Sequence, residues 1–257
     1  MKAAKTVISA IEQSTATVIY RKAIVIRKEQ EVRLHFSREI EMSETGIRER
    51  VTNIFLLLYL IEQAHVSGKV EDELKLQKLA FLAEKDLIAR RLKALSYNFF
   101  RWLKGPFSKN LRLDLILLMQ SGFLQKGANG IELTNKATEI LSNCRGLIEA
   151  NRDFLRSIDH VTAIYSNHPP DQIKELVYSM EIMVPKVRQM MIIRDIPMSQ
   201  LILFKMSDEK AKAVFDIDES TLVTLELTFD SEACNSLSQA IDDATEGRAH
   251  EFTVRDS

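Results

Sequence analysis

The sequence predicts a mainly α-helical protein with small β elements, an α+β arrangement. Glycine (8) and proline (5) are scarce among the 257 residues, which favours long regular elements joined by few loops. Several stretches place apolar residues at helical spacing, while shorter ones alternate apolar and polar residues as half-buried strands do. These changes of pattern divide the chain into an N-terminal α/β segment at 1–47, a helical core at 48–190 and an acidic α+β tail at 191–257.

Composition narrows the function classes. The chain is 46% hydrophobic and 28% charged, as is common for globular proteins in water. Its formal net charge of -1 means that nucleic-acid binding would need a local basic patch. Cys144 and Cys234 lie far apart in sequence and do not have the spacing of metal ligands. The first 20 residues lack the apolar core of a signal peptide. The longest apolar run, 54–61, is too short to cross a bilayer. We therefore expect a reduced, cytoplasmic protein with no membrane partner.

The core segment contains most of the expected helices. In the helix at 70–92, leucines and Phe81 form a broad apolar stripe, with Lys75, Lys78 and Lys85 expected on the outer face. The basic run at 89–93 is expected to be a solvated face. The remaining core elements are a helix at 47–66, an extended aromatic stretch at 95–103, a helix from Ser108 to Gly122, a hairpin at 123–133, a helix beginning at Thr134, and helices at 148–166 and 171–183.

The terminal segments mix helix and strand. The N-terminal one predicts a short helix at 2–13 and a hairpin at 23–36. In the tail, 201–205 is a strand candidate, and the alternation in 221–229 predicts a second strand with Leu225, Leu227 and Phe229 on one face. A helix at 230–247 and a closing strand at 249–254 complete the prediction.

The order of elements around residues 97–124 matches a winged helix-turn-helix module. The helix beginning at Ser108 would be the recognition helix and the hairpin at 123–133 the wing. If this module contacts DNA, the candidate DNA-binding residues are Lys104, Ser108, Lys109, Asn110, Arg112 and Lys126. The alternative is a buried scaffold helix, because this helix is strongly apolar and Asp114 lies close to its few positive groups.

Three quoted stretches resemble the Panacea domain, the SocA-like antitoxin family. They are KLQKLAFLAEKD at 75–86, YNFFRWLKGPFSKNL at 97–111 and SGFL at 121–124, and the resemblance covers roughly residues 54–178. The Leu-Gln-Lys-Leu core and the Gly-Pro dipeptide stand at matching places, although Trp-Leu-Lys replaces the more usual Tyr before Gly-Pro.

This resemblance implies an antitoxin that neutralises a cognate toxin by direct binding, in a prokaryotic toxin–antitoxin or phage-defence module. The acidic tail could cover a basic toxin site, and the candidate partner-binding residues are Leu225, Leu227, Phe229, Asp242, Asp243 and Glu246. A small packed subdomain with an acidic surface is the alternative for the tail. A DNA-binding regulator that represses its own operon is the alternative for the whole chain, and self-association into a homo-oligomer is left open.

Motifs of known enzyme classes do not occur in the sequence. It contains no HExxH, no GxxxxGK[ST] or GxGxxG phosphate loop and no GxSxG elbow, and its neighbouring carboxylates lie one or two residues apart, where helical side chains diverge. We therefore expect no catalytic residues, no cofactor and no metal, and a protein that acts by binding.

Overall fold

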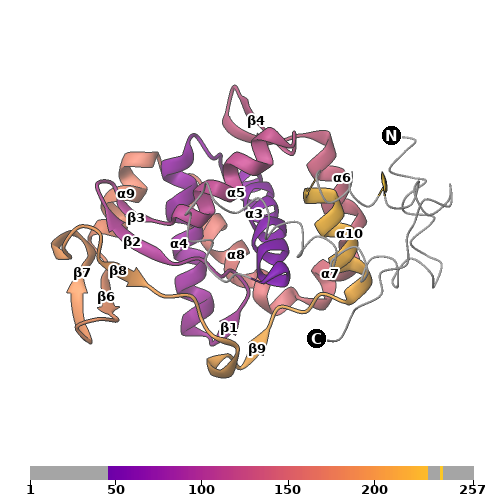
Figure 1. The fold of residues 1–257 in the computed structure, drawn as a ribbon. Coiled ribbons are helices and arrows are strands. Elements are labelled where there is room, and N and C mark those ends of the chain that lie inside the picture. The colour runs from indigo at the N-terminus through magenta and orange to yellow at the C-terminus, as the bar shows by residue number, and fades with distance from the viewer. Residues whose placement is uncertain (1–45, 231–237, 240–257) are drawn as a thin grey trace. The chain divides into compact units, whose positions relative to one another are not determined.

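The computed structural model describes residues 46–230 and 238–239 (Figure 1). Its internal contacts divide the chain into one compact unit, Gly46–Asp218, and a second that combines Met1–Thr45 with Glu219–Ser257. The elements expected at 2–13, 23–36 and 249–254 lie outside the described residues, and so does nearly all of the helix expected at 230–247.

The unit Gly46–Asp218 is mixed helix and strand, as the sequence predicts. Its helices are α3 (Ile47–Ser67), α4 (Glu73–Ala89), α5 (Lys109–Gln120), α6 (Asn135–Asn143), α7 (Arg145–Ala150), α8 (Arg152–Tyr165) and α9 (Pro170–Tyr178), with short 3-10 helices η1 (Ile193–Asp195) and η2 (Asp208–Lys210). Its strands are β1 (Leu92–Lys93), β2 (Phe99–Trp102), β3 (Gly105–Phe107), β4 (Leu124–Gly127), β5 (Gly130–Leu133), β6 (Glu181–Val184), β7 (Gln189–Ile192), β8 (Leu201–Leu203) and β9 (Ala213–Val214).

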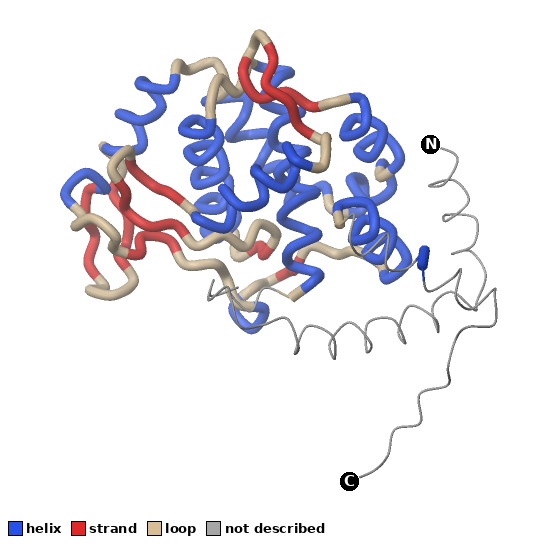
Figure 2. The backbone as a smooth tube through the Cα atoms, turned by 45° about the horizontal axis from the view of Figure 1, so that its top comes forward, coloured by secondary structure: helices blue, strands red, loops and turns tan. Residues whose placement is uncertain are grey.

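Helix α3 is the centre of the hydrophobic core. Every residue from Ile54 to Ile61 is buried, so this helix is apolar on all sides. Helix α8 packs against both α3 and α4, and Figure 1 shows the three in the middle of the unit, among the helices that are blue in Figure 2. Burial of each large aliphatic side chain contributes roughly 1.5–3 kcal/mol, so this trio supplies the platform for the surrounding strands.

Local residues delimit the helices. The Asp72 carboxylate accepts a hydrogen bond from the Lys75 backbone N–H (2.9 Å) at the start of α4, two residues after the expected start of this helix. At the end of α5, Gly122 has a left-handed backbone (φ 71°). The N–H of Phe123 donates to the Leu118 carbonyl (2.9 Å), and the N–H of Gly122 donates to that of Met119 (3.2 Å). This Schellman arrangement stops the helix and turns the chain into β4.

Most strands gather at one end of the unit. Strands β3, β2 and β8 form an antiparallel sheet in that order, and the hairpin β6–β7 lies beside β8 (Figure 1). Strand β1 pairs with β9 in parallel. The hairpin β4–β5 stands apart from these strands and follows α5, as expected for 123–133.

Three boundaries differ from the sequence prediction. The chain does not divide at 190, because β7 spans that position, β8 pairs with β2 and β9 pairs with β1; residues 191–218 therefore belong to the same unit as the helical core. The helix expected at 171–183 ends at Tyr178, after which the hairpin β6–β7 begins. The helix expected at 148–166 is divided at Asn151 into α7 and α8. The Asn151 side chain forms two hydrogen bonds with the backbone of Asp216.

The expected strand at 221–229 is a helix, α10 (Glu219–Phe229). This stretch fits both the alternation of a strand and the repeat of a helix, since Leu222, Leu225 and Phe229 recur at helical spacing and all are buried. The threonines that favour a strand are accommodated because the hydroxyl of Thr228 donates to the carbonyl of Thr224 one turn earlier (2.6 Å). Among the residues that the structure describes, no helix has both the length and the apolar character needed to cross a membrane.

Candidate functional site

The predicted recognition helix α5 is only partly accessible. Leu111, Leu115 and Leu118 are buried, while Leu113 and Ile116 are exposed. Asp114 faces inward, where the Tyr97 hydroxyl donates to its carboxylate (2.8 Å), and burial raises the pKa of Asp114 to about 6. The outer face of α5 is therefore partly apolar, and Asp114 is tied to the core.

The candidate DNA-binding residues are dispersed over several elements of the fold. Lys104 in the β2–β3 turn, Lys109 in α5 and Lys126 in β4 are exposed. Asn110 is half-buried. The guanidinium of Arg112 forms an ion pair with Glu73 (Nε to Oε1, 3.4 Å).

Ser108 is placed differently from the expectation for a DNA contact. Its side chain is buried, and its hydroxyl accepts a hydrogen bond from the Leu111 N–H (3.4 Å), which caps α5. Ser108 therefore fits the predicted capping role and has no surface from which to reach a base or phosphate.

The residues that carry the Panacea resemblance form a buried polar contact between α4 and the start of α5. The Gln77 amide nitrogen donates to the Ser108 carbonyl (3.0 Å), and the Gln77 amide oxygen accepts from the Ser108 N–H (2.8 Å). The Lys78 ammonium donates to the Pro106 carbonyl (2.8 Å), and burial lowers the pKa of Lys78 to about 7. These side chains hold the Gly-Pro turn in place, so Gln77 and Lys78 have a structural role in this fold.

The expectation that Lys75 and Lys78 lie on the outer face of α4 is wrong. Both are buried, and the Lys75 ammonium donates to the Ser166 carbonyl (2.6 Å) and pairs with Glu71 (2.7 Å). Burial of a lysine is tolerated where its ammonium finds acceptors, and backbone carbonyls supply them here.

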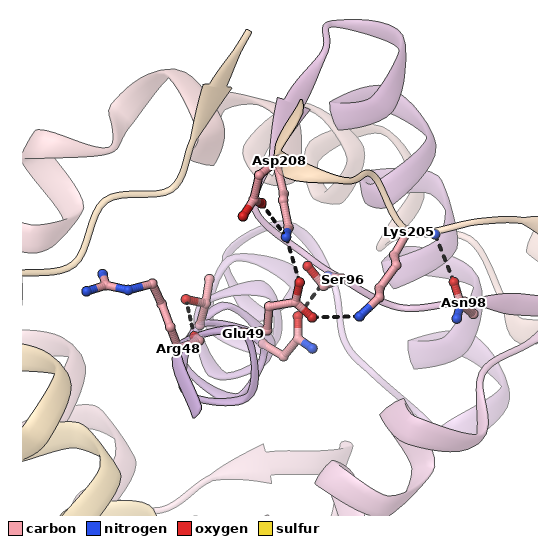
Figure 3. A network of polar contacts seen from close by, with 9 residues as sticks. Arg48, Glu49, Ser96, Asn98, Lys205 and Asp208 are labelled. Atoms are coloured by element: carbon pink, nitrogen blue, oxygen red, sulfur yellow. Dashed lines mark hydrogen bonds and ion pairs between the residues drawn. The ribbon is translucent and has the colours of Figure 1, made fainter. Parts of the chain in front are cut away.

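The most concentrated group of charges in Gly46–Asp218 surrounds Glu49 at the first turn of α3. Its carboxylate accepts from the ammonium groups of Lys93 (2.6 Å) and Lys205 (2.8 Å), and Lys93 also pairs with Asp208 (2.5 Å), as Figure 3 shows. We call these four residues the Glu49 cluster. Partial burial favours the neutral form of Glu49, but the two lysines outweigh it and hold the pKa of Glu49 below its usual value.

Short backbone contacts position the Glu49 cluster. The Asn53 side chain accepts from the Ser96 N–H (2.8 Å), which fixes the segment after β1 against α3. The Asn98 side chain accepts from the Lys205 N–H (2.8 Å), and the Phe215 N–H donates to the Lys93 carbonyl (2.7 Å). Segments distant in sequence are thus held together by amide side chains and a parallel strand pair.

A pocket of about 250 Å³ lies beside the Glu49 cluster. Its walls are formed by Gly46, Arg48, Glu49, Thr52, Lys93, Ala94, Ser96, Asp208, Val214 and Phe215. The sequence prediction missed this site, because Lys93 was expected in a solvated basic run and is buried instead. No local sequence signal marks this site, because its walls come from segments that are distant along the chain.

Glu84 is a fully buried carboxyl close to the Glu49 cluster. It accepts a hydrogen bond from the Tyr97 backbone N–H, whereas its Oε2 atom has no hydrogen-bond partner. Burial raises the pKa of Glu84 well above 4.5, and the charge of Glu49 adds to this effect while Lys93 and Lys205 oppose it. Glu84 therefore keeps its proton in the folded state at pH values where the unfolded chain has lost it.

Replacing Glu84 with glutamine is expected to flatten the pH dependence of stability. Since the folded pKa lies above the unfolded one, wild-type stability falls as pH rises from 4.5 toward the folded pKa. Glutamine keeps the shape of the side chain and does not titrate. The free energy of unfolding of Glu84→Gln, relative to that of wild type, should therefore increase as pH rises. Urea unfolding across this range measures the difference. The matched control is Asp153→Asn, at an exposed carboxylate, and parallel curves for Glu84→Gln and wild type would contradict the prediction.

Exposed apolar side chains gather at the strand-rich end of the unit. They lie on the sheet β3–β2–β8, the hairpin β6–β7 and the adjoining turns: Phe100, Trp102, Leu103, Met183, Val187, Met190, Ile192, Met198 and Phe204. Met183 and Met190 are directly paired across β6 and β7. The Tyr178 hydroxyl donates to the Leu103 carbonyl (2.7 Å) and Arg101 Nε to the Ile193 carbonyl (3.0 Å), which joins the β2–β3 turn to the base of that hairpin. We call this surface the apolar end.

The structure describes only some of the candidate partner-binding residues of the tail. Leu225, Leu227 and Phe229 are buried on α10, so their expected placement on one face of a strand is wrong. Asp242, Asp243 and Glu246 lie outside the described residues.

Searches for relatives give no family for this chain. No protein-family model, no curated protein and no solved structure matches it. Within residues 46–230 and 238–239, no group of three or more His, Cys, Asp or Glu side chains is placed to hold a metal ion.

Proposed function

We propose that the chain is an antitoxin-like binding protein, which neutralises a cognate toxin by direct protein–protein contact and carries out no chemistry. The observation that carries the binding function is the apolar end. The antitoxin identity is supported by the sequence resemblance to the Panacea domain over roughly residues 54–178.

The apolar end has the properties of a protein-binding surface. More than half of the large apolar side chains that are exposed in Gly46–Asp218 lie on it, although the unit has other surface on which to place them. Contiguous exposed apolar side chains mark interaction sites, and methionine and tryptophan are suited to them because they offer adaptable and large contact areas. Leu103 and Met190 are 68% and 54% exposed, so they are available to a partner without rearrangement of the core.

The buried position of the motif residues supports the same proposal. Gln77 and Lys78 contact the backbone of Pro106 and Ser108, so they build the scaffold and leave recognition to exposed positions. Partner choice would then follow the side chains of the apolar end, which can change without disturbing the scaffold.

Charged substitutions in the apolar end are expected to abolish partner capture. Leu103→Glu combined with Met190→Glu places two carboxylates in the proposed interface, and uncompensated buried charges at interfaces cost several kcal/mol, so affinity should fall more than about 100-fold. The measurement is capture of the protein encoded beside this gene by the tagged full-length chain, with rescue of growth as the functional readout.

The control for this pair is Val66→Glu, an exposed apolar position at the end of α3 that lies outside the apolar end. It should leave capture and rescue unchanged, and thermal unfolding should show both variants to be folded. Equal capture by all variants would exclude the apolar end as the interface, and no capture by wild type would sink the antitoxin proposal.

The acidic tail is a second proposed contact for the toxin. A deletion that tests it should begin after Asp218, because Phe215 and Ile217 are buried in the unit Gly46–Asp218 and a cut near 205 would remove them. Loss of capture in this deletion, with the unit still folded, would assign neutralisation to the tail.

DNA binding through a winged-helix-like α5 and β4–β5 hairpin is the alternative proposal. The exposed Lys104, Lys109 and Lys126 favour it, whereas the buried Ser108 and the pairing of Arg112 with Glu73 weaken it. A DNA-binding chain should lose affinity steeply with salt, and Lys109→Glu with Arg112→Glu should remove that affinity. Unchanged DNA binding in this pair would exclude α5 as the reading helix.

A further inference from the structure

The hairpin β6–β7 leaves one strand edge open at the apolar end. Strand β7 (Gln189–Ile192) pairs with β6 and, within the part of the chain that the structure describes, with no other strand; Figure 1 shows it at the outer margin of the strands. The Ile193 N–H donates to the Met180 carbonyl (2.9 Å), so these two residues form a hydrogen-bonded pair. Such pairs alternate along an antiparallel ladder, which places Met190 and Ile192 in non-hydrogen-bonded pairs. Their backbone N–H groups therefore point away from β6, and so does the Met190 carbonyl.

These outward backbone groups are available to a partner. Among the described residues, no hydrogen bond reaches the N–H or carbonyl of Met190 or the N–H of Ile192. The two residues are 54% and 37% exposed. A row of unpaired N–H and carbonyl groups at a sheet edge is a template for another strand, and Gln189–Ile192 contains neither a proline nor a charged residue that would oppose pairing.

Other strand edges of the unit carry features that prevent such pairing. On the outer edge of β3, Pro106 has no N–H, and its carbonyl already accepts from the Lys78 ammonium (2.8 Å). On β4, the exposed Lys126 places a charge at the edge. The contrast with β7 indicates that its edge is suited to receive a strand.

The side chains beside this edge favour apolar residues in the added strand. Met183 and Met190 are directly paired across β6 and β7, and both are about half exposed. A strand that pairs with Met190 would extend this row by one side chain, and apolar cross-strand neighbours stabilise a sheet. Since side chains alternate between the two faces of a strand, the partner segment needs an apolar residue at every second position.

The turn between β6 and β7 adds a preference for negative charge. Lys186 and Arg188 are exposed in this turn, and neither has an ion-pair partner among the described residues. A second copy of this chain fits the edge less well. Both antiparallel registers that match Met190 with Met190 or Ile192 of another β7 bring Arg188 or Lys186 toward Arg194 of the other copy, and like charges opposite each other are destabilising.

We propose that β7 binds an extended segment of a partner protein as an added antiparallel strand. The segment exchanges two backbone hydrogen bonds with Met190 and accepts one from the Ile192 N–H. It has apolar residues at alternate positions and carboxylates at its C-terminal end, which antiparallel pairing places beside Lys186 and Arg188. This inference deepens the proposed function by stating how the partner is held, and it rests on that function for the identity of the partner as the toxin.

The first test is a titration of the ¹⁵N-labelled full-length chain with a short synthetic peptide that alternates valine and threonine and ends in two glutamates. We expect saturable backbone amide shifts at Met190 and Ile192, and roughly 3- to 10-fold weaker binding of the matched peptide that ends in two lysines. N-methylation of the peptide backbone should abolish binding at every second position and be tolerated in between, because only alternate N–H groups face β7. Shifts that do not saturate, or equal effects of N-methylation at all positions, would overturn strand addition, and equal affinity for the two peptides would overturn the charge preference.

A pair of variants at one position tests the same edge in the partner assay. Met190→Pro removes an N–H that β6 does not use, so the hairpin should persist, whereas Met190→Thr keeps this N–H and changes only the side chain. Proline should weaken both peptide binding and capture of the protein encoded beside this gene at least about 10-fold more than threonine does, and thermal unfolding should show both variants to be folded.

The outcomes separate this inference from the proposed function. Capture by wild type with equal losses in Met190→Pro and Met190→Thr would overturn strand addition and keep the apolar end as the interface. Saturable peptide binding at β7 without any capture by wild type would support the strand-binding edge and remove the antitoxin proposal.

Discussion

Replacing Gly130 with alanine is expected to lower the free energy of unfolding by about 3 kcal/mol or more, from backbone strain and steric overlap together. Gly130 has a φ of 105°, and a Cβ atom there would lie 2.1 Å from the Val70 carbonyl oxygen. That carbonyl also accepts the Ile131 N–H (2.8 Å), so the hairpin β4–β5 cannot move away without losing its attachment. Urea unfolding of the full-length protein measures the loss.

Gly122→Ala separates the two causes. Gly122 also has a left-handed backbone (φ 71°), but its Cβ would meet nothing within 4 Å. We expect it to cost only about 1–2 kcal/mol, the conformational part of the effect. Equal losses in the two variants would show that the overlap with Val70 is relieved by movement of the hairpin.

Replacing Gln77 with leucine is expected to cost roughly 2–5 kcal/mol, because a buried donor and a buried acceptor each lose their partner at about 1–3 kcal/mol. The Gln77 amide serves both the N–H and the carbonyl of Ser108, and both residues are almost fully buried. Thermal and urea unfolding measure the stability. Local opening should appear as faster hydrogen exchange of the Leu111 amide, whose acceptor Ser108 is no longer held.

The control for this change is Gln120→Leu, at an exposed position in the last turn of α5. Surface substitutions of this kind stay within about 0.5 kcal/mol. If Gln77→Leu is as mild as Gln120→Leu, the buried amide contact does not hold α5 in place.

Features that depend on local chemistry were predictable from the sequence. Ser108 and Gly122 delimit α5 through a cap and a left-handed turn, which neighbouring letters determine. The hairpin at 123–133 follows from its turn residues, and β8 from its short apolar run. For the cap, the left-handed turn and the hairpin, the determining contacts lie within a few residues along the chain, whereas β8 also needs β2 from about 100 residues away as its pairing partner.

Features that depend on distant partners were not predictable. A lysine in the sequence predicts an outward side chain, yet the lysines at 75, 78 and 93 are buried. Their ammonium groups are paired with acceptors from distant segments, which are Ser166, Pro106 and Glu49 respectively. The candidate pocket was not predictable for the same reason, because its walls come from α3, from the segment after β1 and from residues 208–215. Helix α10 was missed because its apolar positions satisfy two periods equally well.

The buried side chains of α4 constrain how this protein can change. Gln77 and Lys78 bind backbone atoms of Ser108 and Pro106, and Lys75 binds the backbone carbonyl of Ser166. Because these partners are backbone atoms, no substitution of Ser108, Pro106 or Ser166 can restore a contact that is lost when the α4 side chain is changed. Suppressor screens starting from a defective Gln77 should recover reversion or general stabilisers elsewhere, and should not recover compensating changes at the residues that Gln77 contacts.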